Sequence, residues 1–240
     1  DYARPVSAKA VSSGIQIDWI PVSGAMGYRI MRKNTVNVWE VIGTASGEST
    51  SSYVDTEPLN NYINEYSVKS YSINDSGYYD KTGVSCYFLK SPEITSVSNG
   101  ANGITVKWET VNGAYDYVIY RKTEGQTEWK AYATVSSGVT QFTDSQVEAG
   151  KTYSYTVSSK NTTMESALNS GITQTFLVQP RIAVYNVVAG VAIRWAYTGS
   201  ADAFKVYRKT STTGRSLIYT AKGKERVYVD KNLRYSTEYT

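Results

Sequence analysis

GIQIDW at residues 14–19, GITVKW at residues 103–108 and GVAIRW at residues 190–195 are three versions of one pattern. In each version apolar residues alternate with other residues, and a tryptophan ends the run. Alternation with period two predicts a β-strand that buries one face. The three tryptophans, Trp19, Trp108 and Trp195, recur after 89 and 87 residues. The chain therefore repeats a module of about 90 residues.

Three further blocks recur in the same order at the same spacing. The first is an apolar strand ending in Arg-Lys, at residues 28–33, 117–122 and 204–209. The second is a short strand ending in an aspartate, and the third is a tyrosine soon afterwards. These residues are Asp55, Asp144 and Asp230, followed by Tyr66, Tyr153 and Tyr239. Turn-forming clusters separate the blocks about every ten residues, which predicts an antiparallel β-sandwich rather than a parallel α/β fold.

This order of blocks resembles the fibronectin type III module. The resemblance covers the whole chain and implies an all-β protein of tandem, immunoglobulin-like β-sandwiches, each a seven-strand Greek-key module. It implies that Trp19, Trp108 and Trp195 are the core tryptophans of the modules. It also implies that Tyr66, Tyr153 and Tyr239 are corner tyrosines, whose hydroxyl groups reach the backbone a few residues upstream.

The repeat predicts three modules, at residues 1–91, 92–179 and 180–240. For the second module we expect strands A to G at 94–98, 103–109, 115–122, 129–135, 140–144, 153–159 and 170–178. The first module follows the same plan, with an E-to-F connection two residues longer, counted from Asp55 to Tyr66. The third module reaches Thr240 without strands F and G. We expect either that the natural chain continues beyond a cut or that a partner, or another copy of this chain, donates the missing strands.

Composition argues against catalysis and bound cofactors. The 240 residues include no histidine, which removes the commonest general base and the commonest zinc ligand. No phosphate-binding glycine loop, nucleophile elbow, Cys/His metal spacing or carboxylate cluster occurs. The single cysteine, Cys86, cannot form a disulfide within the chain. We therefore expect no enzyme, no cofactor, no metal and no small-molecule substrate. No apolar run is long enough to span a membrane.

Positive charge is concentrated in the third module. Residues 180–240 contain 11 Lys and Arg against 4 Asp and Glu, whereas residues 1–91 contain 8 against 9. A basic surface of this kind suits an anionic polymer. The alternative is that these residues only protect exposed strand faces.

Four aromatic residues are candidates for ligand contact. Trp39 and Trp129 occupy the same place in strand C′ of the first two modules, and Tyr78 and Tyr79 lie in a polar F–G turn. Flat aromatic faces at such positions can stack on sugar rings. The alternative is that the tryptophans pack over the edge of their own sheet and that the tyrosines are ordinary surface residues.

The resemblance implies a non-catalytic spacer, adhesion or protein-binding segment of a secreted or cell-surface, and therefore extracellular, protein. The cysteine-poor chain, rich in Tyr, Thr, Ser and Asn, looks like bacterial examples. The alternative function is a carbohydrate-binding accessory region of a larger polysaccharide-degrading enzyme. The expected partner is accordingly a protein or a cell-surface glycan.

Overall fold

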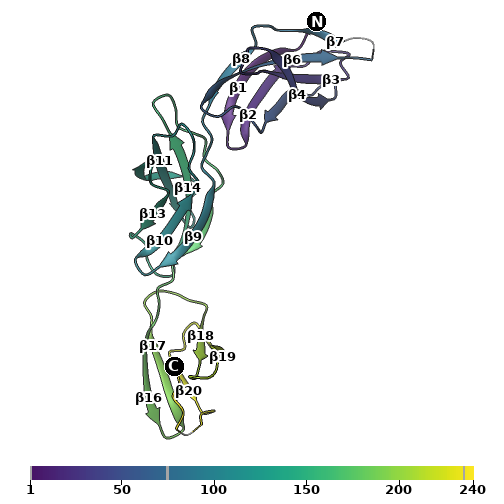
Figure 1. The fold of residues 1–240 in the computed structure, drawn as a ribbon. Helices are drawn as coiled ribbons and strands as arrows, with labels where there is room; N and C mark the ends of the chain where they lie inside the picture. Colours follow the sequence, from purple (N-terminus) through teal and green to yellow (C-terminus); the bar gives the residue numbers. More distant parts are fainter. Residues whose placement is uncertain (1, 74–75, 235) are drawn as a thin grey trace.

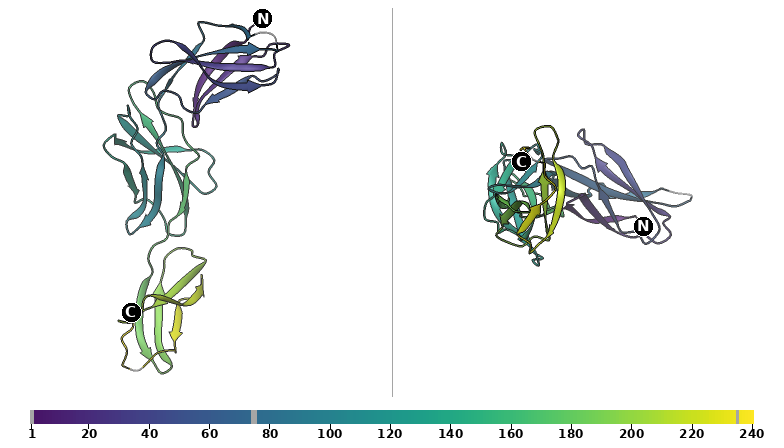
Figure 2. Two further views of the ribbon diagram at one scale, coloured as in Figure 1. Left: turned by 45° about the vertical axis from the view of Figure 1, so that its right-hand side comes forward. Right: turned by 90° about the horizontal axis from the view of Figure 1, so that it is seen from below.

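The computed structural model describes residues 2–73, 76–234 and 236–240, and these residues form β-strands joined by turns and loops (Figure 1). The strands fall into three groups along the chain, which we call unit 1 (β1–β8), unit 2 (β9–β15) and unit 3 (β16–β20). The units follow one another in an elongated arrangement. Seen from below, units 2 and 3 overlap and unit 1 extends to one side (Figure 2). The expected all-β architecture of tandem sandwiches is confirmed.

Unit 1 consists of two antiparallel sheets. One sheet has the order β1-β2-β5, and in the other β3 is flanked by β4 and β6, with both β7 and β8 pairing with β6. The strands are β1 (Arg4–Val11), β2 (Gly14–Ile20), β3 (Gly27–Lys33), β4 (Trp39–Ser46), β5 (Ser52–Asp55), β6 (Tyr62–Tyr71), β7 (Ser76–Tyr79) and β8 (Val84–Phe88).

Unit 2 repeats this plan with the sheets β9-β10-β13 and β12-β11-β14-β15. Its strands lie where the sequence pattern places them, although the last one is shorter than expected. They are β9 (Ile94–Gly100), β10 (Gly103–Trp108), β11 (Asp116–Thr123), β12 (Lys130–Ser136), β13 (Gln141–Asp144), β14 (Thr152–Lys160) and β15 (Ile172–Thr175).

Unit 3 has the first sheet of this plan and half of the second. The sheets are β16-β17-β20 and β18-β19. The strands are β16 (Arg181–Val187), β17 (Gly190–Ala196), β18 (Ala203–Arg208), β19 (Ser216–Lys222) and β20 (Val227–Asp230). Along the other edge of β18, the described residues contribute one isolated bridge, between Thr210 and Tyr239.

Each unit has its own hydrophobic core around the tryptophan of the repeat. Trp19 is 2% exposed and contacts Tyr28, with ring centroids 5.3 Å apart, and Trp108 is 3% exposed and lies 5.6 Å from Tyr117. Burying a large apolar side chain stabilises a fold by about 1.5–3 kcal/mol, so these aromatic pairs anchor the two sheets together. Among the described residues of unit 3, the buried cluster consists of Trp195 itself, Phe204 and Ala221.

Steric crowding explains why a glycine begins each strand that ends near a core tryptophan, namely β2, β10 and β17. At Gly103 the backbone φ is 139°, and a Cβ there would lie 2.0 Å from the carbonyl oxygen of Asp144. Only glycine therefore lets β10 approach the end of β13 so closely. Gly14 and Gly190 meet Asp55 and Asp230 in the same way.

Candidate functional site

The aspartate at the end of β13 is buried and bonded to an arginine of the opposite sheet. Asp144 is 0% exposed, and its Oδ2 accepts a hydrogen bond from Arg121 Nη1 at 2.8 Å. The same Nη1 donates to the backbone carbonyl of Gln146 at 3.1 Å, while Asp144 Oδ1 accepts the backbone N–H of Gln146 at 2.9 Å. The ion pair thus joins the two sheets and closes the turn after β13.

Two tyrosine hydroxyl groups complete the hydrogen bonding of Asp144. Tyr155 donates to Oδ2 at 2.7 Å, and Tyr132 donates to Oδ1 at 2.8 Å. Burial on its own would raise the pKa of Asp144, but the bonds from Arg121, Tyr155 and Tyr132 outweigh it and hold the pKa below its usual value. Burial, followed by the bond to Asp144, raises the pKa of Tyr155.

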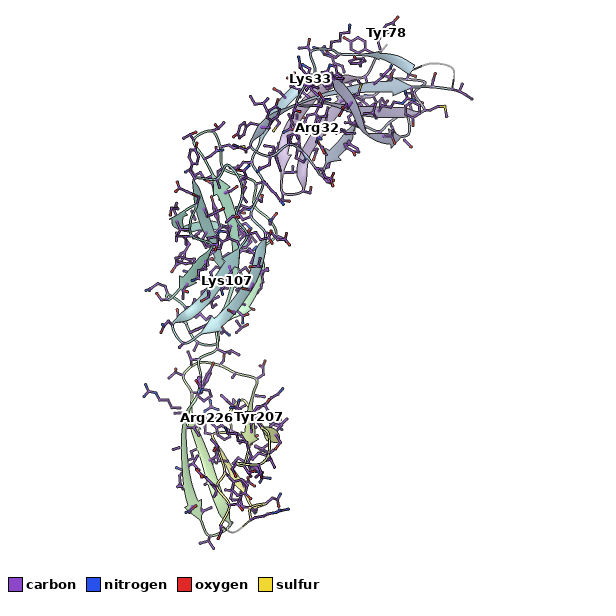
Figure 3. The ribbon with its side chains drawn as sticks, in the orientation of Figure 1. Arg32, Lys33, Tyr78, Lys107, Tyr207 and Arg226 are labelled. Carbon is purple, nitrogen blue, oxygen red and sulfur yellow. The ribbon has the colours of Figure 1, made fainter. Side chains whose placement is uncertain are left out.

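Unit 1 carries the same ion pair and one of the two tyrosine bonds. Arg32 Nη1 donates to Asp55 Oδ2 at 2.6 Å, and the Tyr66 hydroxyl donates to the same oxygen at 2.8 Å (Figure 3 labels Arg32). Burial and the bond to Asp55 raise the pKa of Tyr66.

Unit 3 keeps the ion pair without the tyrosine. Arg208 Nη1 donates to Asp230 Oδ2 at 2.8 Å, and Asp230 is 2% exposed. Among the described residues no tyrosine donates to Asp230.

The sequence analysis identifies these aspartates only as the last residues of short strands. It places Arg32, Arg121 and Arg208 in a repeated strand but does not pair them with the aspartates, although both sets recur at the spacing of the tryptophans. That spacing was the signal that could have found them.

Corner tyrosines are present in units 2 and 3. The Tyr153 hydroxyl accepts the backbone N–H of Glu148 at 3.0 Å, and the Tyr239 hydroxyl accepts the backbone N–H of Arg234 at 2.8 Å. Both bonds join residues five positions apart, across the turn that precedes the tyrosine. Tyr153 is 3% exposed, whereas Tyr239 is half-buried.

In unit 1 the corner residue is Asn64, and the expectation that Tyr66 is the corner tyrosine is wrong. Asn64 Oδ1 accepts the backbone N–H of Leu59, again five positions upstream, at 2.9 Å. Tyr66 lies opposite Arg32 instead and is fully buried in the core. Counted from Asp55 to Asn64, the connection has the same length as in unit 2. The longer E-to-F connection expected for the first module is therefore wrong as well.

Trp39 and Trp129, the two candidate tryptophans, are half-buried over the last connection of their units. A Cβ at Gly83 would lie 3.2 Å from Trp39 Cη2, and one at Gly171 would lie 2.7 Å from Trp129 Cη2. The structure thus places both indoles in the same packing environment.

A lysine ammonium covers each of these indole rings. Lys33 Nζ lies 5.1 Å from the Trp39 ring centroid, and Lys122 Nζ lies 4.5 Å from that of Trp129. Part of the surface that a sugar ring would need is therefore occupied by the chain itself.

The two candidate tyrosines have different environments. The Tyr79 ring meets Trp39 edge-on at 6.3 Å, and Lys69 Nζ lies 6.0 Å from its centroid. Tyr78 is 86% exposed and lies at the outer end of unit 1, away from Arg32 (Figure 3). The four candidate residues therefore do not form one aromatic platform, because Trp129 belongs to unit 2.

Units 1 and 2 contact each other through two loops. Asn60, in the loop before β6, donates through Nδ2 to the backbone carbonyl of Asn112, in the loop between β10 and β11, at 2.8 Å. Next to this bond, a Cβ at Gly113 would lie 2.4 Å from Cγ of Asn61. A glycine at position 113 is therefore required for the two loops to approach this closely.

The linker between units 1 and 2 is itself hydrogen-bonded to unit 2. Ser159 Oγ donates to the carbonyl of Lys90 at 2.5 Å, and Ser91 Oγ donates to the carbonyl of Ala167 at 2.5 Å. These bonds hold the linker on the surface of unit 2, so the first junction is not a free hinge.

Units 2 and 3 meet through the corresponding loops. Ala149 and Gly150 stand before β14 where Asn60 and Asn61 stand before β6. A Cβ at Gly199 would lie 2.4 Å from the carbonyl oxygen of Ala149, and one at Gly150 would lie 2.4 Å from Ser200 Oγ. The same loop-to-loop docking thus occurs twice, with fewer hydrogen bonds at the second junction.

The strand order of units 1 and 2 decides the fold. In both units the first, second and fifth strands form one sheet, and in the other sheet the sixth strand pairs with the third. A buried tryptophan ends the second strand of each. This strand order and the place of the tryptophan are those of the fibronectin type III fold.

Three of the solved structures that are similar to this chain come from chicken proteins. The chicken CNTN1 FN1-FN3 domains are 13% identical, with a TM-score of 0.33, over 98% of this chain and 90% of that one. The chicken interferon gamma receptor alpha chain is 12% identical, with a TM-score of 0.44, over 74% of this chain and 99% of that one. A two-domain fibronectin type III segment of chicken tenascin is 12% identical, with a TM-score of 0.36, over 73% and 99%. No family model and no curated protein matches this chain.

Within residues 2–73, 76–234 and 236–240, no group of three or more His, Cys, Asp or Glu side chains is placed to hold a metal ion. In the same residues, no helix has the length and apolar character needed to cross a membrane.

Unit 3 has a hollow of about 490 Å³ beside β16 and β17. Its lining is mostly apolar but includes three arginines (Figure 3 labels Arg226). The residues that line this hollow include Arg181, Ile182, Arg194, Trp195, Arg226 and Val227.

Proposed function

We propose that this chain is a non-catalytic spacer and protein-binding segment of a secreted or cell-surface protein, of bacterial type. The units correspond in this proposal to modules at residues 1–91, 92–179 and 180–240. The repeated loop-to-loop docking at the two junctions carries the proposal. It fixes the direction of each unit relative to the next, which is what a spacer needs in order to hold a neighbouring domain at a set distance.

The physical basis is strongest at the first junction. There the Asn60–Asn112 bond, the Asn61–Gly113 contact and the linker bonds act together. Each neutral hydrogen bond contributes roughly 0.5–1.5 kcal/mol net, so a joint with several of them favours one orientation over a freely rotating linker. The second junction rests mainly on close backbone contact and is expected to be the more mobile of the two.

Solution X-ray scattering on the intact chain tests the spacer function. An elongated particle whose profile matches one arrangement of the units is expected. A profile that only a broad ensemble of orientations at the first junction can fit would contradict it.

A carbohydrate-binding accessory role in a polysaccharide-degrading enzyme is the alternative. It would use Trp39, Trp129, Tyr78 and Tyr79, of which only Tyr78 is largely exposed. The lysines over both indoles support packing more than sugar stacking. Titration with polysaccharides while tryptophan fluorescence is followed, with Trp39→Ala and Trp129→Ala as controls, separates the two functions. Quenching that both variants abolish would favour the carbohydrate-binding role.

A further inference from the structure

The outer face of the β16-β17-β20 sheet sets unit 3 apart from units 1 and 2. Successive residues of these strands point alternately toward the core, which Trp195 marks, and away from it. We call the side that points away the outer face. Its six central residues are Ala183, Tyr185, Ala192, Arg194, Val227 and Val229. All of them except Arg194 are aliphatic or aromatic.

The equivalent six positions are hydrophilic in the other two units. In unit 2 they are Ser96, Ser98, Thr105, Lys107, Gln141 and Thr143. In unit 1 they are Ser7, Lys9, Gln16, Asp18, Ser52 and Val54. Polar side chains on an outer face are usual where one side of an antiparallel sheet meets solvent. The fold therefore does not require the apolar outer face of unit 3.

The strands that cover the cores of units 1 and 2 leave the outer face open. In unit 2, β14 pairs with β11 in the second sheet and β15 pairs with β14. Lys107 and Gln141, on the outer face of this unit, are exposed all the same. The outer face of unit 3 is thus open because of its place in the fold, and further strands in the second sheet would not cover it.

Apolar side chains of this face are open to solvent. Val227 is 47% exposed and Tyr185 is 38% exposed, and Ala183 is exposed as well. The central strand reads VAIRWA at residues 191–196, which is apolar on both sides except at Arg194. Runs of this kind are typical of strands that are covered on both faces. An exposed apolar sheet face of this kind indicates an interaction surface.

The exposed charges of this sheet are positive. Arg194 lies on the central strand, with its guanidinium carbon 5.5 Å from the centroid of the Tyr185 ring, and Arg181 points outward at the start of β16. Among the described residues, neither arginine forms an ion pair. Asp230, the one acidic residue of the three strands, is buried on the core side. Carboxylates of a partner would complement this face, whereas a second copy would bring like charges together.

The end of the face that carries the arginines is hollowed. Arg181, Ala183, Arg194 and Val227 line part of the hollow of about 490 Å³, whose lining includes no Asp or Glu. Arginine pairs with a carboxylate through two parallel hydrogen bonds, and arginine and tyrosine are enriched in protein interfaces. This end of the face therefore suits an acidic side chain that stands beside apolar ones.

We propose that the outer face of β16, β17 and β20 binds a partner protein through a surface on which apolar side chains lie beside carboxylates. The apolar side chains pack on Tyr185, Val227 and Val229, and the carboxylates pair with Arg194 and Arg181. This inference rests on the proposed protein-binding function and names the chemistry of the partner.

A fluorescently labelled random copolymer of glutamate and tyrosine is the probe, and polyglutamate of the same length is the control without apolar side chains. Fluorescence anisotropy measures the binding of each polymer to the intact chain. The copolymer is expected to bind roughly tenfold more tightly than polyglutamate, because only the copolymer can cover the apolar part of the face.

Substitutions locate the site within the chain. Val227→Glu should weaken copolymer binding roughly tenfold, since it interrupts the apolar face and repels the carboxylates. Gln141→Glu is the matched control, because Gln141 holds the same position in unit 2, and it should leave binding unchanged. Arg194→Gln should weaken binding and reduce its dependence on salt. Ile182→Glu, on the core side of the same sheet, should leave binding unchanged.

Equal affinity for the two polymers, equal effects of Val227→Glu and Gln141→Glu, or unchanged binding by Arg194→Gln would overturn the proposal. Loss of binding in Ile182→Glu but not in Val227→Glu would place the site on the core side and overturn it too. Self-association of the chain that Val227→Glu abolishes would overturn it in favour of a second copy as the occupant. Scattering that shows a fixed array while the copolymer fails to bind removes this site alone and leaves the spacer function.

Discussion

The side-chain amide of Asn60 donates a 2.8 Å hydrogen bond to the backbone carbonyl of Asn112, across the junction between units 1 and 2. Both residues lie in loops, and the loops at the next junction meet in the same way through Gly150 and Gly199. The direction of the array is thus set by contacts between loops of neighbouring units and not by the linkers alone.

Replacement of Asp144 by asparagine is expected to destabilise unit 2 by about 3 kcal/mol, because it leaves Arg121 half-buried without its counter-charge. Chemical denaturation followed by tryptophan fluorescence measures this change. Glu148→Gln is the matched control, since its ion pair with Lys151 is exposed, and it should leave the unfolding midpoint unchanged. Equal effects of the two substitutions would show that the buried pair has no special importance.

The stability of unit 2 should fall in acid in a way that depends on Asp144. The folded protein holds the pKa of this carboxyl below its value in the unfolded chain, about 3.9. The resulting stabilisation is present above that pH and is lost as the pH falls through the lower folded-state pKa. Denaturation at a series of pH values between about 2 and 5 measures it. A wild-type slope identical to that of Asp144→Asn would contradict the assignment.

Tyr66 and Tyr155 are expected to resist ionisation in alkali. Burial and the bonds to Asp55 and Asp144 raise the pKa of both phenols, whereas exposed tyrosines ionise near pH 10. Because the folded-state pKa is raised, the stabilisation is present below about pH 10 and declines above it. Phenolate absorbance should show at least two tyrosines that titrate only on unfolding. Tyr155→Phe should remove one of them, and an unchanged curve would refute the assignment.

Trp39→Ala is expected to destabilise unit 1 by about 2 kcal/mol, since the half-buried indole packs at Gly83 and under Lys33. Tyr78→Ala serves as the comparison, because Tyr78 is largely exposed and its removal should be nearly neutral. Thermal unfolding measures both. If Trp39→Ala left stability unchanged, the indole would be free for a ligand and the packing interpretation would be wrong.

The repeat alone predicted the sandwich fold because its signals are local and periodic. Alternation around Trp108 and the turn clusters mark the strands without any knowledge of contacts. The same approach misassigned Tyr66 because it matched residues by type. At the corner position of unit 1, the amide oxygen of Asn64 accepts the backbone N–H that a tyrosine hydroxyl accepts in unit 2. No local sequence pattern shows that an asparagine replaces the tyrosine there.

The contacts between distant residues were the part that could not be predicted. The bond from Arg121 to Asp144 joins opposite sheets, and the Asn60–Asn112 bond joins different units. Arg121 and Asp144 each recur in the repeat, but the repeat does not show that they contact each other, and the Asn60–Asn112 pair does not recur. The candidate aromatics show the same limit, because the sequence placed Trp39 and Trp129 on equivalent strands but could not show the lysines that cover them.

The distance distribution between unit 1 and unit 2 tests the central claim most directly. Spin labels at Lys9→Cys and Lys107→Cys, in a Cys86→Ser background, report this distance by pulsed electron paramagnetic resonance. One narrow distribution is expected, and Gly113→Ala should broaden it because its Cβ meets Asn61. Gly125→Ala, which also has a positive φ but no neighbour within 4 Å, should not broaden it. A broad distribution in the unsubstituted junction, or no response to Gly113→Ala, would contradict the rigid spacer.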